Sequence, residues 1–297
     1  MPKEIGRLLT AMVTPFDQHG EVDYTQAKTL AQALLSSGSD GVVIAGTTGE
    51  SPTLTRQEQT RLFVEVKGSV LDSGSVIAGT GSNSTQEAIN YTKDAEESGV
   101  DGVLLVVPYY NKPTQEGLYE HFKAIAENTS LPCILYNVPS RTITSLSAET
   151  TIRLSEIPNI VGIKEASGDF EKIASITGSA EPGFRVWSGN DADTFHVLCL
   201  GGYGVISVAS HLVGLQIKTM IQMLVNGNLD GAAKEHIRLL PIFNGIFIVA
   251  NPIPIKYGVN RVGFEVGHPR LPLTQTDKAT SNFLDNLFDQ YHMDLSV

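Results

Sequence analysis

Eight short apolar runs within residues 8–208 constrain the fold of this chain more than any other feature. They are rich in β-branched residues, they are continuous rather than alternating, and each is too short to form a helix. The runs occupy residues 8–13, 42–45, 76–78, 103–107, 133–136, 160–163, 186–187 and 205–208. Strands that are buried on both faces of a parallel sheet have this pattern. The sequence therefore predicts eight parallel strands.

The segments between the runs carry signals for helices. Thr55-Arg56-Gln57-Glu58 and Ser84-Thr85-Gln86-Glu87 have the pattern of a capping box, in which the hydroxyl and the carboxylate each satisfy a free amide at a helix start. A weak internal repeat supports the same unit, because Ser37-Gly38-Ser39-Asp40-Gly41-Val42 returns as Ser98-Gly99-Val100-Asp101-Gly102-Val103. Strand followed by helix is therefore the predicted repeating unit.

Eight such units that close on themselves form a (β/α)8 barrel, whereas an open doubly wound sheet typically has about six strands. We therefore expect an α/β protein with a (β/α)8 TIM barrel over residues 1–224. Beyond Ser210 the strand pattern stops, and residues 213–224, 229–240 and 281–291 have the pattern of helices. Residues 225–297 are expected to form a C-terminal helical domain.

Composition and charge exclude several classes of partner. The formal net charge is −11, aromatic residues make up 7% of the chain and basic residues form no stripe, which argues against a nucleic-acid partner. No stretch approaches the roughly 18 apolar residues of a membrane span, and residues 1–7 lack the apolar core of a secretory signal. We therefore expect a cytoplasmic protein without a membrane partner. Cys133 and Cys199 lie within apolar runs and are expected to pack in the core.

Reactive side chains at the C-terminal ends of barrel strands are candidates for an active site. Lys164 directly follows the sixth run and is the only one of twelve lysines in such a position. A buried ammonium loses hydration, which favours the neutral, nucleophilic amine that Schiff-base chemistry requires. The alternative is a structural ion pair with Glu165 or another carboxylate. Lys256 is a second candidate, but it lies in the tail, beyond the predicted barrel.

Three further positions follow predicted strands. Tyr136 ends the fifth run, so its phenol would lie beside Lys164 and transfer protons, unless it only packs its ring. Gly46-Thr47-Thr48-Gly49-Glu50-Ser51 follows the second run, and its glycines allow a turn that directs backbone amides toward an anion, although such turns are common. Arg141 follows Tyr136 and suits a substrate carboxylate, or is an ordinary surface arginine.

The sequence lacks the usual motifs for metals and nucleotides. It has no His-Glu-x-x-His, His-x-His or Cys-x-x-Cys pattern, so a metal site has little support. Asp191, Asp193 and His196 are residue types that bind metals, but they are expected instead to cap and charge the start of a helix. Gly79-Thr80-Gly81-Ser82-Asn83-Ser84 lacks the third glycine of a dinucleotide motif. No cofactor is therefore expected.

Three motifs in register carry a resemblance that covers essentially the whole chain. Gly46-Thr47-Thr48-Gly49-Glu50, Tyr136-Asn137-Val138-Pro139-x-Arg141-Thr142 and Gly162-Ile163-Lys164-Glu165 resemble, in this order and spacing, the dihydrodipicolinate synthase family. That family belongs to the superfamily of pyruvate-dependent Schiff-base aldolases, which includes N-acetylneuraminate lyase. The resemblance implies a barrel with a C-terminal helical domain, assembled as a homotetramer of two tight dimers.

The resemblance also implies a lyase of the diaminopimelate route of lysine biosynthesis. Lys164 would condense with pyruvate to an imine, which in its protonated form acidifies the former methyl group. The enamine that results would attack aspartate 4-semialdehyde and give 4-hydroxy-tetrahydrodipicolinate.

Further residues take their roles from the same resemblance. A proton relay would join Thr48, Tyr136 and a Tyr110 that is donated across the dimer interface. The amides of Thr47 and Thr48 would hold the pyruvate carboxylate. The remaining substrate contacts would be Arg141, which holds the semialdehyde carboxylate, and the backbones of Gly189 and Ile206, which line the pocket.

Two other functions stay open at this point. N-acetylneuraminate lyase and 2-keto-3-deoxy sugar-acid aldolases share the lysine and the tyrosine, but neuraminate lyases usually have Ser-Thr in place of Thr47-Thr48 and generally lack an equivalent of Arg141. A barrel that senses a small molecule without catalysis is the third hypothesis, which the presence of both Lys164 and Tyr136 disfavours.

Many members of the family are inhibited by lysine at the dimer interface. The residues that match this allosteric site are Ser51, Asn83, Glu87 and Tyr109. Arg56 and Gln59 depart from it, because inhibited bacterial relatives commonly have histidines at both positions. A guanidinium at Arg56 would repel the ammonium of lysine, so the sequence leaves inhibition open.

Overall fold

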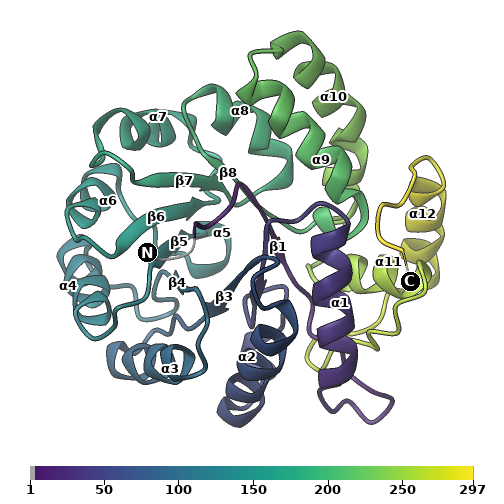
Figure 1. The fold of residues 1–297 in the computed structure, drawn as a ribbon, viewed down its shortest axis with the longest axis horizontal. Coiled ribbons are helices and arrows are strands. Elements are labelled where there is room, and N and C mark those ends of the chain that lie inside the picture. Colours follow the sequence, from purple (N-terminus) through teal and green to yellow (C-terminus); the bar gives the residue numbers. More distant parts are fainter. Residues whose placement is uncertain (1–3, 297) are drawn as a thin grey trace.

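A closed barrel of eight parallel strands, in the order of the sequence, forms the centre of the molecule (Figure 1). The structure is a computed structural model that describes residues 4–296; residues 1–3, the start of the polar opening segment, and residue 297 lie outside the described residues. The strands are β1 Leu8–Ala11, β2 Gly41–Ile44, β3 Ser75–Gly79, β4 Gly102–Val106, β5 Cys133–Asn137, β6 Ile160–Glu165, β7 Arg185–Ser188 and β8 Gly204–Ser207. They coincide with the eight predicted runs, apart from small shifts at their ends, so the (β/α)8 barrel is confirmed.

Helices surround the barrel as an outer layer (Figure 1). They are α1 Tyr24–Ser36, α2 Arg56–Val70, α3 Thr85–Glu97, α4 Gln115–Ala126, α5 Pro139–Thr142, α6 Ala148–Ser155, α7 Phe170–Ser179 and α8 Thr194–Cys199, with 3-10 helices η1 Ser51–Thr53 and η2 Asp191–Asp193. The Thr55 capping box at α2 is confirmed. The second box is wrong in part, because Ser84 accepts from the Glu87 amide while the Glu87 carboxylate accepts from the Ser82 hydroxyl at 2.9 Å.

Four helices follow the last strand. They are α9 Ser210–Val225, α10 Leu229–Gly245, α11 Ile253–Arg261 and α12 Lys278–Phe288. Three of them were predicted, but α11 was not, because Pro252 and Pro254 are residues typical of a loop. Proline is tolerated at the start of a helix, where the backbone amides have no helical partner. Figure 1 shows α11 and α12 on the side of the barrel where α1 lies. No helix within residues 4–296 is both long and apolar enough to cross a membrane.

The register between β5 and β6 determines which residues lie next to each other at the C-terminal end of the barrel. Tyr136 is paired with Lys164, and Asn137 with Glu165. Because successive side chains of a strand point to opposite faces, the second pair lies outside the barrel when the first lies inside. Nδ2 of Asn137 donates to both carboxylate oxygens of Glu165, at 3.0 and 2.9 Å. This outer pair therefore stabilises the register that holds Tyr136 and Lys164 side by side.

The two cysteines differ in their surroundings. Cys133 is buried in β5 as predicted, and burial raises the pKa of its thiol to about 12. Cys199 is exposed, so its predicted packing is wrong. It ends the short helix α8, whose buried positions are Thr194 and Val197.

Candidate active site

Lys164 and Tyr136 lie next to each other at the C-terminal end of the barrel. Lys164 is 5% exposed, and its Nζ lies 4.3 Å from the centroid of the Tyr136 ring. This end of a (β/α)8 barrel is where enzymes of that fold have their active sites. The structure therefore places a desolvated amine beside a phenol, as the sequence predicted.

Glu165 does not pair with Lys164. Its carboxylate faces the helix layer, where it accepts hydrogen bonds from Asn137 and from the amide of Ser167 at 2.8 Å. Burial raises the pKa of Glu165, and these hydrogen bonds oppose the rise. The alternative of a Lys164–Glu165 ion pair is therefore wrong, because adjacent residues of one strand point to opposite faces.

Asp191 is a fully buried carboxylate that interacts electrostatically with Lys164. It accepts hydrogen bonds from the Ser207 hydroxyl and from the amides of Val208 and Ala209, both at 3.1 Å. Burial raises the pKa of Asp191, against these hydrogen bonds and the positive charge of Lys164. Asp191 lies in the first turn of η2 after β7, as predicted. The predicted capping is wrong, because the carboxylate accepts from the amides that follow β8.

Asp193 and His196 contact neighbouring side chains. Asp193 is the N-cap of α8 but makes no capping hydrogen bond, and it accepts instead from the Asn190 side chain at 2.8 Å. The His196 ring packs edge-on against the rings of Phe195 and His236. Within residues 4–296, no group of three His, Cys, Asp or Glu side chains could hold a metal ion.

The loop after β2 carries the predicted anion-binding motif. Thr48 is 3% exposed, and its hydroxyl oxygen accepts a hydrogen bond from Nδ2 of Asn251 at 2.9 Å. Glu50 is buried and adopts a left-handed backbone conformation with φ of 57°. A side chain of the tail therefore contacts the loop at Thr48, and the neighbouring Thr47 lines a cavity.

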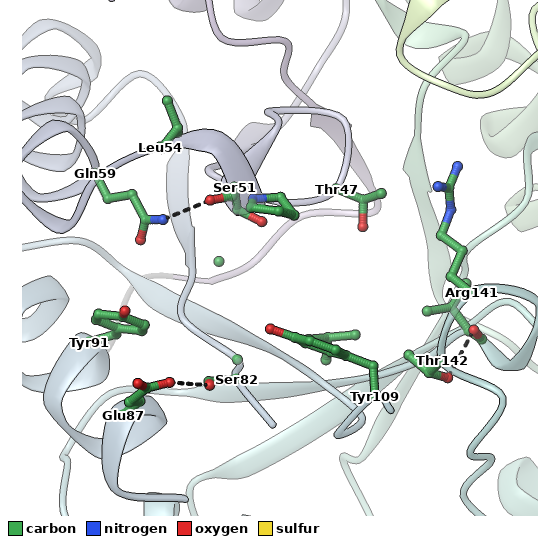
Figure 2. A pocket seen from close by; sticks show the side chains of 15 residues that line it. Thr47, Ser51, Leu54, Gln59, Ser82, Glu87, Tyr91, Tyr109, Arg141 and Thr142 are labelled. Carbon is green, nitrogen blue, oxygen red and sulfur yellow. Dashed lines mark hydrogen bonds between the residues drawn. The ribbon is translucent and has the colours of Figure 1, made fainter. Parts of the chain in front are cut away.

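That cavity has a volume of 410 Å³, with Thr47 and Arg141 at one end and Glu87 and Tyr91 at the other (Figure 2). A smaller cavity of 40 Å³ shares Thr47 and part of its wall with the first and reaches Tyr136. The structure thus brings Thr47, Arg141 and Tyr136 onto adjoining spaces at the barrel mouth, where a small anionic substrate would meet both a guanidinium and a phenol.

The residues matched to a lysine site are only partly brought together. Ser51, Glu87 and Tyr109 line the larger cavity, and Nδ2 of Asn83 donates to the Tyr109 carbonyl at 3.2 Å. The Arg56 guanidinium is turned away and bonds both carboxylate oxygens of Asp94. The repulsion expected from Arg56 therefore has no geometric basis.

Tyr110, Gly189 and Ile206 lie at three different places. Tyr110 is 89% exposed with φ of 74°, and it is not among the residues that line the cavity. Gly189 follows β7, and its amide donates to the Glu165 carbonyl at 2.7 Å. Ile206 is fully buried within β8. A role for Tyr110 in this site therefore requires a second chain.

Three side chains of the tail reach the loop after β2. Asn251 donates to Thr48, as described above. Nζ of Lys256 lies 2.7 Å from Oε1 of Glu50, and both side chains are only 1% exposed. Burial lowers the pKa of Lys256 to about 8, although Glu50 opposes the change. The sequence placed Lys256 outside the barrel and offered no signal for Asn251, because these contacts join positions about 200 residues apart.

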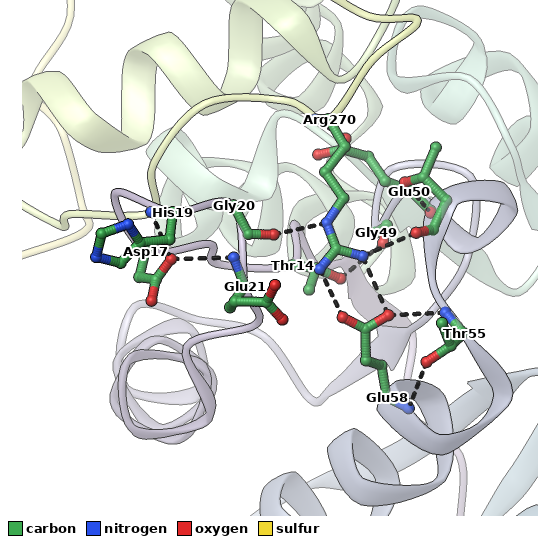
Figure 3. A network of polar contacts seen from close by, with 11 residues as sticks. Thr14, Asp17, His19, Gly20, Glu21, Gly49, Glu50, Thr55, Glu58 and Arg270 are labelled. Carbon is green, nitrogen blue, oxygen red and sulfur yellow. Dashed lines mark hydrogen bonds and ion pairs between the residues drawn. The ribbon is translucent and has the colours of Figure 1, made fainter.

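Arg270 is the third of these residues (Figure 3). Its guanidinium donates to both carboxylate oxygens of Glu58 and to the carbonyls of Gly20 at 2.7 Å and Thr53 at 2.8 Å. Its own amide donates to Glu50 at 2.9 Å. Arg270 therefore connects the tail to Gly20 before α1, to the segment around η1 and to the first turn of α2.

The Glu58–Arg270 ion pair predicts loss of stability in acid. The hydrogen bond from Arg270 lowers the pKa of Glu58 to about 2 from 4.5, so its contribution to the free energy of unfolding is complete above pH 4.5 and is lost as the pH falls toward 2. Glu58→Gln is expected to lower the free energy of unfolding at pH 7 by about 2 kcal/mol, after allowance for solvent screening. Denaturant titrations between pH 7 and pH 2 should show this difference shrinking.

Exposed Glu120 on α4 provides the control, and Glu120→Gln should leave the pH profile of stability unchanged. A Glu58→Gln profile that runs parallel to that of the parent would contradict the assignment.

Comparison with known proteins gives one family. The sequence model of the Dihydrodipicolinate synthetase family matches residues 4–290. A 4-hydroxy-tetrahydrodipicolinate synthase from Dehalococcoides mccartyi is 61% identical over 295 residues, which cover 99% of each chain. Another, from Thermosynechococcus vestitus, is 52% identical over 287 residues, covering 96% of this chain and 97% of the relative.

Solved structures agree with the sequence relatives. The crystal structure of the dihydrodipicolinate synthase from Cyanidioschyzon merolae with lysine bound has a TM-score of 0.95 and 48% sequence identity to this chain. The match covers 96% of this chain and 98% of the other. The resemblance carried by the three sequence motifs is thereby confirmed, and this chain belongs to the dihydrodipicolinate synthetase family.

Proposed function

We propose that this chain condenses pyruvate with L-aspartate 4-semialdehyde to give 4-hydroxy-tetrahydrodipicolinate. The observation that carries the proposal is Lys164, buried at the barrel mouth with its amine 4.3 Å from the Tyr136 ring. Relatives at 61% and 52% identity bear the name of this synthase. They support the condensation rather than the cleavage of sialic or deoxy sugar acids, or a sensor without catalysis.

The reaction follows from the chemistry of the amine. Nζ of Lys164 attacks C2 of pyruvate, and loss of water leaves an iminium. The iminium withdraws electrons from C3, which loses a proton and becomes the nucleophilic carbon of an enamine. This carbon attacks the aldehyde, and the alkoxide that forms takes up a proton. The amine of the second substrate then displaces Lys164 from C2, which closes the ring and restores the free lysine.

Proton transfer and substrate binding are assigned to neighbouring groups. Thr48, Tyr136 and a Tyr110 from a second chain relay protons, while the amides of Thr47 and Thr48 hold the pyruvate carboxylate. Arg141, on the wall of the cavity, holds the semialdehyde carboxylate. The backbones of Gly189 and Ile206 complete the lining of the pocket. Such local donors are needed because a net charge of −11 repels both anionic substrates.

Borohydride reduction tests the covalent step. Incubation with pyruvate and borohydride should add one reduced pyruvyl group, and peptide mapping should locate it on Lys164. A protein that remains unmodified, or carries the label on Lys256, would overturn the proposal.

The active assembly in this proposal is a homotetramer of two tight dimers, in which each chain lends Tyr110 to its partner. The 89% exposure of Tyr110 in the single chain supports this role. Tyr110→Phe should lower kcat by about 100-fold without a change in the sedimentation coefficient, because a proton-transfer group is lost while the ring is kept. A monomer with full activity would contradict both parts.

The far end of the larger cavity is assigned to lysine. Ser51, Glu87 and Tyr109 line it, and the Glu87 carboxylate suits an ammonium group. The lysine bound to the Cyanidioschyzon merolae relative supports this assignment. Lysine should therefore inhibit the parent more strongly than Glu87→Gln, and equal rates with and without lysine would contradict the assignment.

A further inference from the structure

Asn251 connects two parts of the site that lie far apart in the sequence. It stands between α10 and α11 and is 5% exposed. Its Nδ2 donates to the Thr48 hydroxyl oxygen at 2.9 Å, and its backbone carbonyl accepts from Nη2 of Arg141 at 3.5 Å. A single residue of the tail therefore contacts both the loop after β2 and the helix after β5.

The side-chain oxygen of Asn251 has no partner. Within residues 4–296, Oδ1 is one of the few buried side-chain atoms that form no hydrogen bond. A buried acceptor without a donor is unfavourable, so a donor from a water molecule or from a bound ligand stabilises it. With Nδ2 donating to the Thr48 hydroxyl oxygen, Oδ1 is the end of the amide that has no hydrogen-bond partner. The free acceptor is thus held on a residue that also contacts Arg141.

The second substrate of the proposed reaction carries a donor in the matching place. In aspartate 4-semialdehyde the carboxylate and the ammonium are bonded to the same carbon, so a group that binds the ammonium must lie close to the one that binds the carboxylate. The carboxylate is assigned to Arg141, whose guanidinium donates to the backbone carbonyl of Asn251 in the tail.

We infer that Oδ1 of Asn251 accepts a hydrogen bond from the α-ammonium of aspartate 4-semialdehyde and makes the site selective for a semialdehyde that carries this amine. The inference rests on the proposed function. A neutral amide suits the position better than a carboxylate would, because an aspartate beside Arg141 would compete with the substrate carboxylate for the guanidinium.

A purely positional role for Asn251 makes a different prediction. The bond from Nδ2 to Thr48 directs the Thr48 hydroxyl proton away from Asn251, which would affect the pyruvate half of the reaction. Loss of that bond alone would impair every second substrate equally. Loss of the acceptor for the ammonium impairs only the substrate that has one.

The test compares two semialdehydes. Succinate 4-semialdehyde has the same chain, carboxylate and aldehyde as aspartate 4-semialdehyde, but no ammonium. For Asn251→Leu, kcat/KM for aspartate 4-semialdehyde should fall by about 10- to 100-fold, since a hydrogen bond to a charged group is lost. The inhibition constant of succinate 4-semialdehyde, measured against the pyruvate-loaded enzyme, should change by less than about threefold, since it lacks the group in question.

Two variants serve as controls for the comparison of the two semialdehydes. Arg141→Ala should weaken both semialdehydes, because both carry the carboxylate. Asn244→Leu, at an exposed position of α10, should change neither. If Asn251→Leu fails to fold, Asn251→Ala carries the same comparison with a smaller side chain.

The outcomes separate this inference from the proposed function. Equal losses for both semialdehydes, or no loss for either, would overturn the role of Oδ1. Pyruvate labelling of Lys164 by borohydride in Asn251→Leu measures the effect of the lost bond to Thr48, and the loss for aspartate 4-semialdehyde should exceed that effect. Absence of labelling in the parent itself would instead overturn the proposed function.

Discussion

Replacing Lys164 by methionine is expected to lower kcat/KM for the condensation by at least about 10⁴-fold, because neither the iminium nor the enamine forms without the amine. Methionine keeps much of the length and the apolar contacts of lysine, so the packing of the barrel mouth should persist. The rate of product formation measures the loss, and borohydride labelling by pyruvate should disappear with it.

Two variants serve as controls for this experiment. Lys123→Met, on α4 beside the Tyr119 ring, should keep the parental rate. Tyr136→Phe should still be labelled by pyruvate while its kcat falls by about 100-fold, because it loses a proton-transfer group and not the nucleophile. Condensation by Lys164→Met within about tenfold of the parent would rule out the imine mechanism.

Replacing Lys256 by methionine is expected to lower the free energy of unfolding by about 3 to 5 kcal/mol, because it leaves the Glu50 carboxylate buried without a counter-charge. Both side chains of the pair are 1% exposed, so water cannot take the place of the ammonium. Nζ also lies 3.9 Å from the centroid of the Phe16 ring, a contact that methionine retains only in part. Denaturant titration at one fixed protein concentration measures the change.

The matched control is Lys28→Met, which removes one half of the partly exposed ion pair with Glu65 and should lower the free energy of unfolding by less than about 1 kcal/mol. The double variant Glu50→Gln, Lys256→Met should regain part of the loss, because no unpaired charge remains. A Lys256→Met protein as stable as Lys28→Met would show that the buried pair contributes little.

The barrel could be predicted from the sequence because each strand leaves a local trace. A strand that is buried on both faces must be apolar at successive positions, and helices separate such strands. Lys164 and Tyr136 could be found for the same reason, since Lys164 directly follows an apolar run and Tyr136 ends one. The helix α11 could not be predicted, because Pro252 and Pro254 at its start have the same sequence pattern as a loop.

The parts of the site that the sequence did not reveal depend on contacts between distant residues. Asn251 and Thr48 are 203 positions apart, and Arg270 and Glu50 are 220 apart. No periodicity links such pairs, so a single sequence contains no signal for them. Asp191 shows the converse error: its position before a helix predicted a cap, but the amides after β8 were closer partners in the fold.

The anchoring of one loop by Asn251, Lys256 and Arg270 limits how enzymes of this kind can exchange parts by recombination. A chimera that joins residues 1–224 to the tail of another barrel would keep Lys164 and take the residues at these three positions from the other parent. Recombined chains should be active only when the loop after β2 and these three residues come from the same parent. The loop and the tail are therefore expected to evolve together.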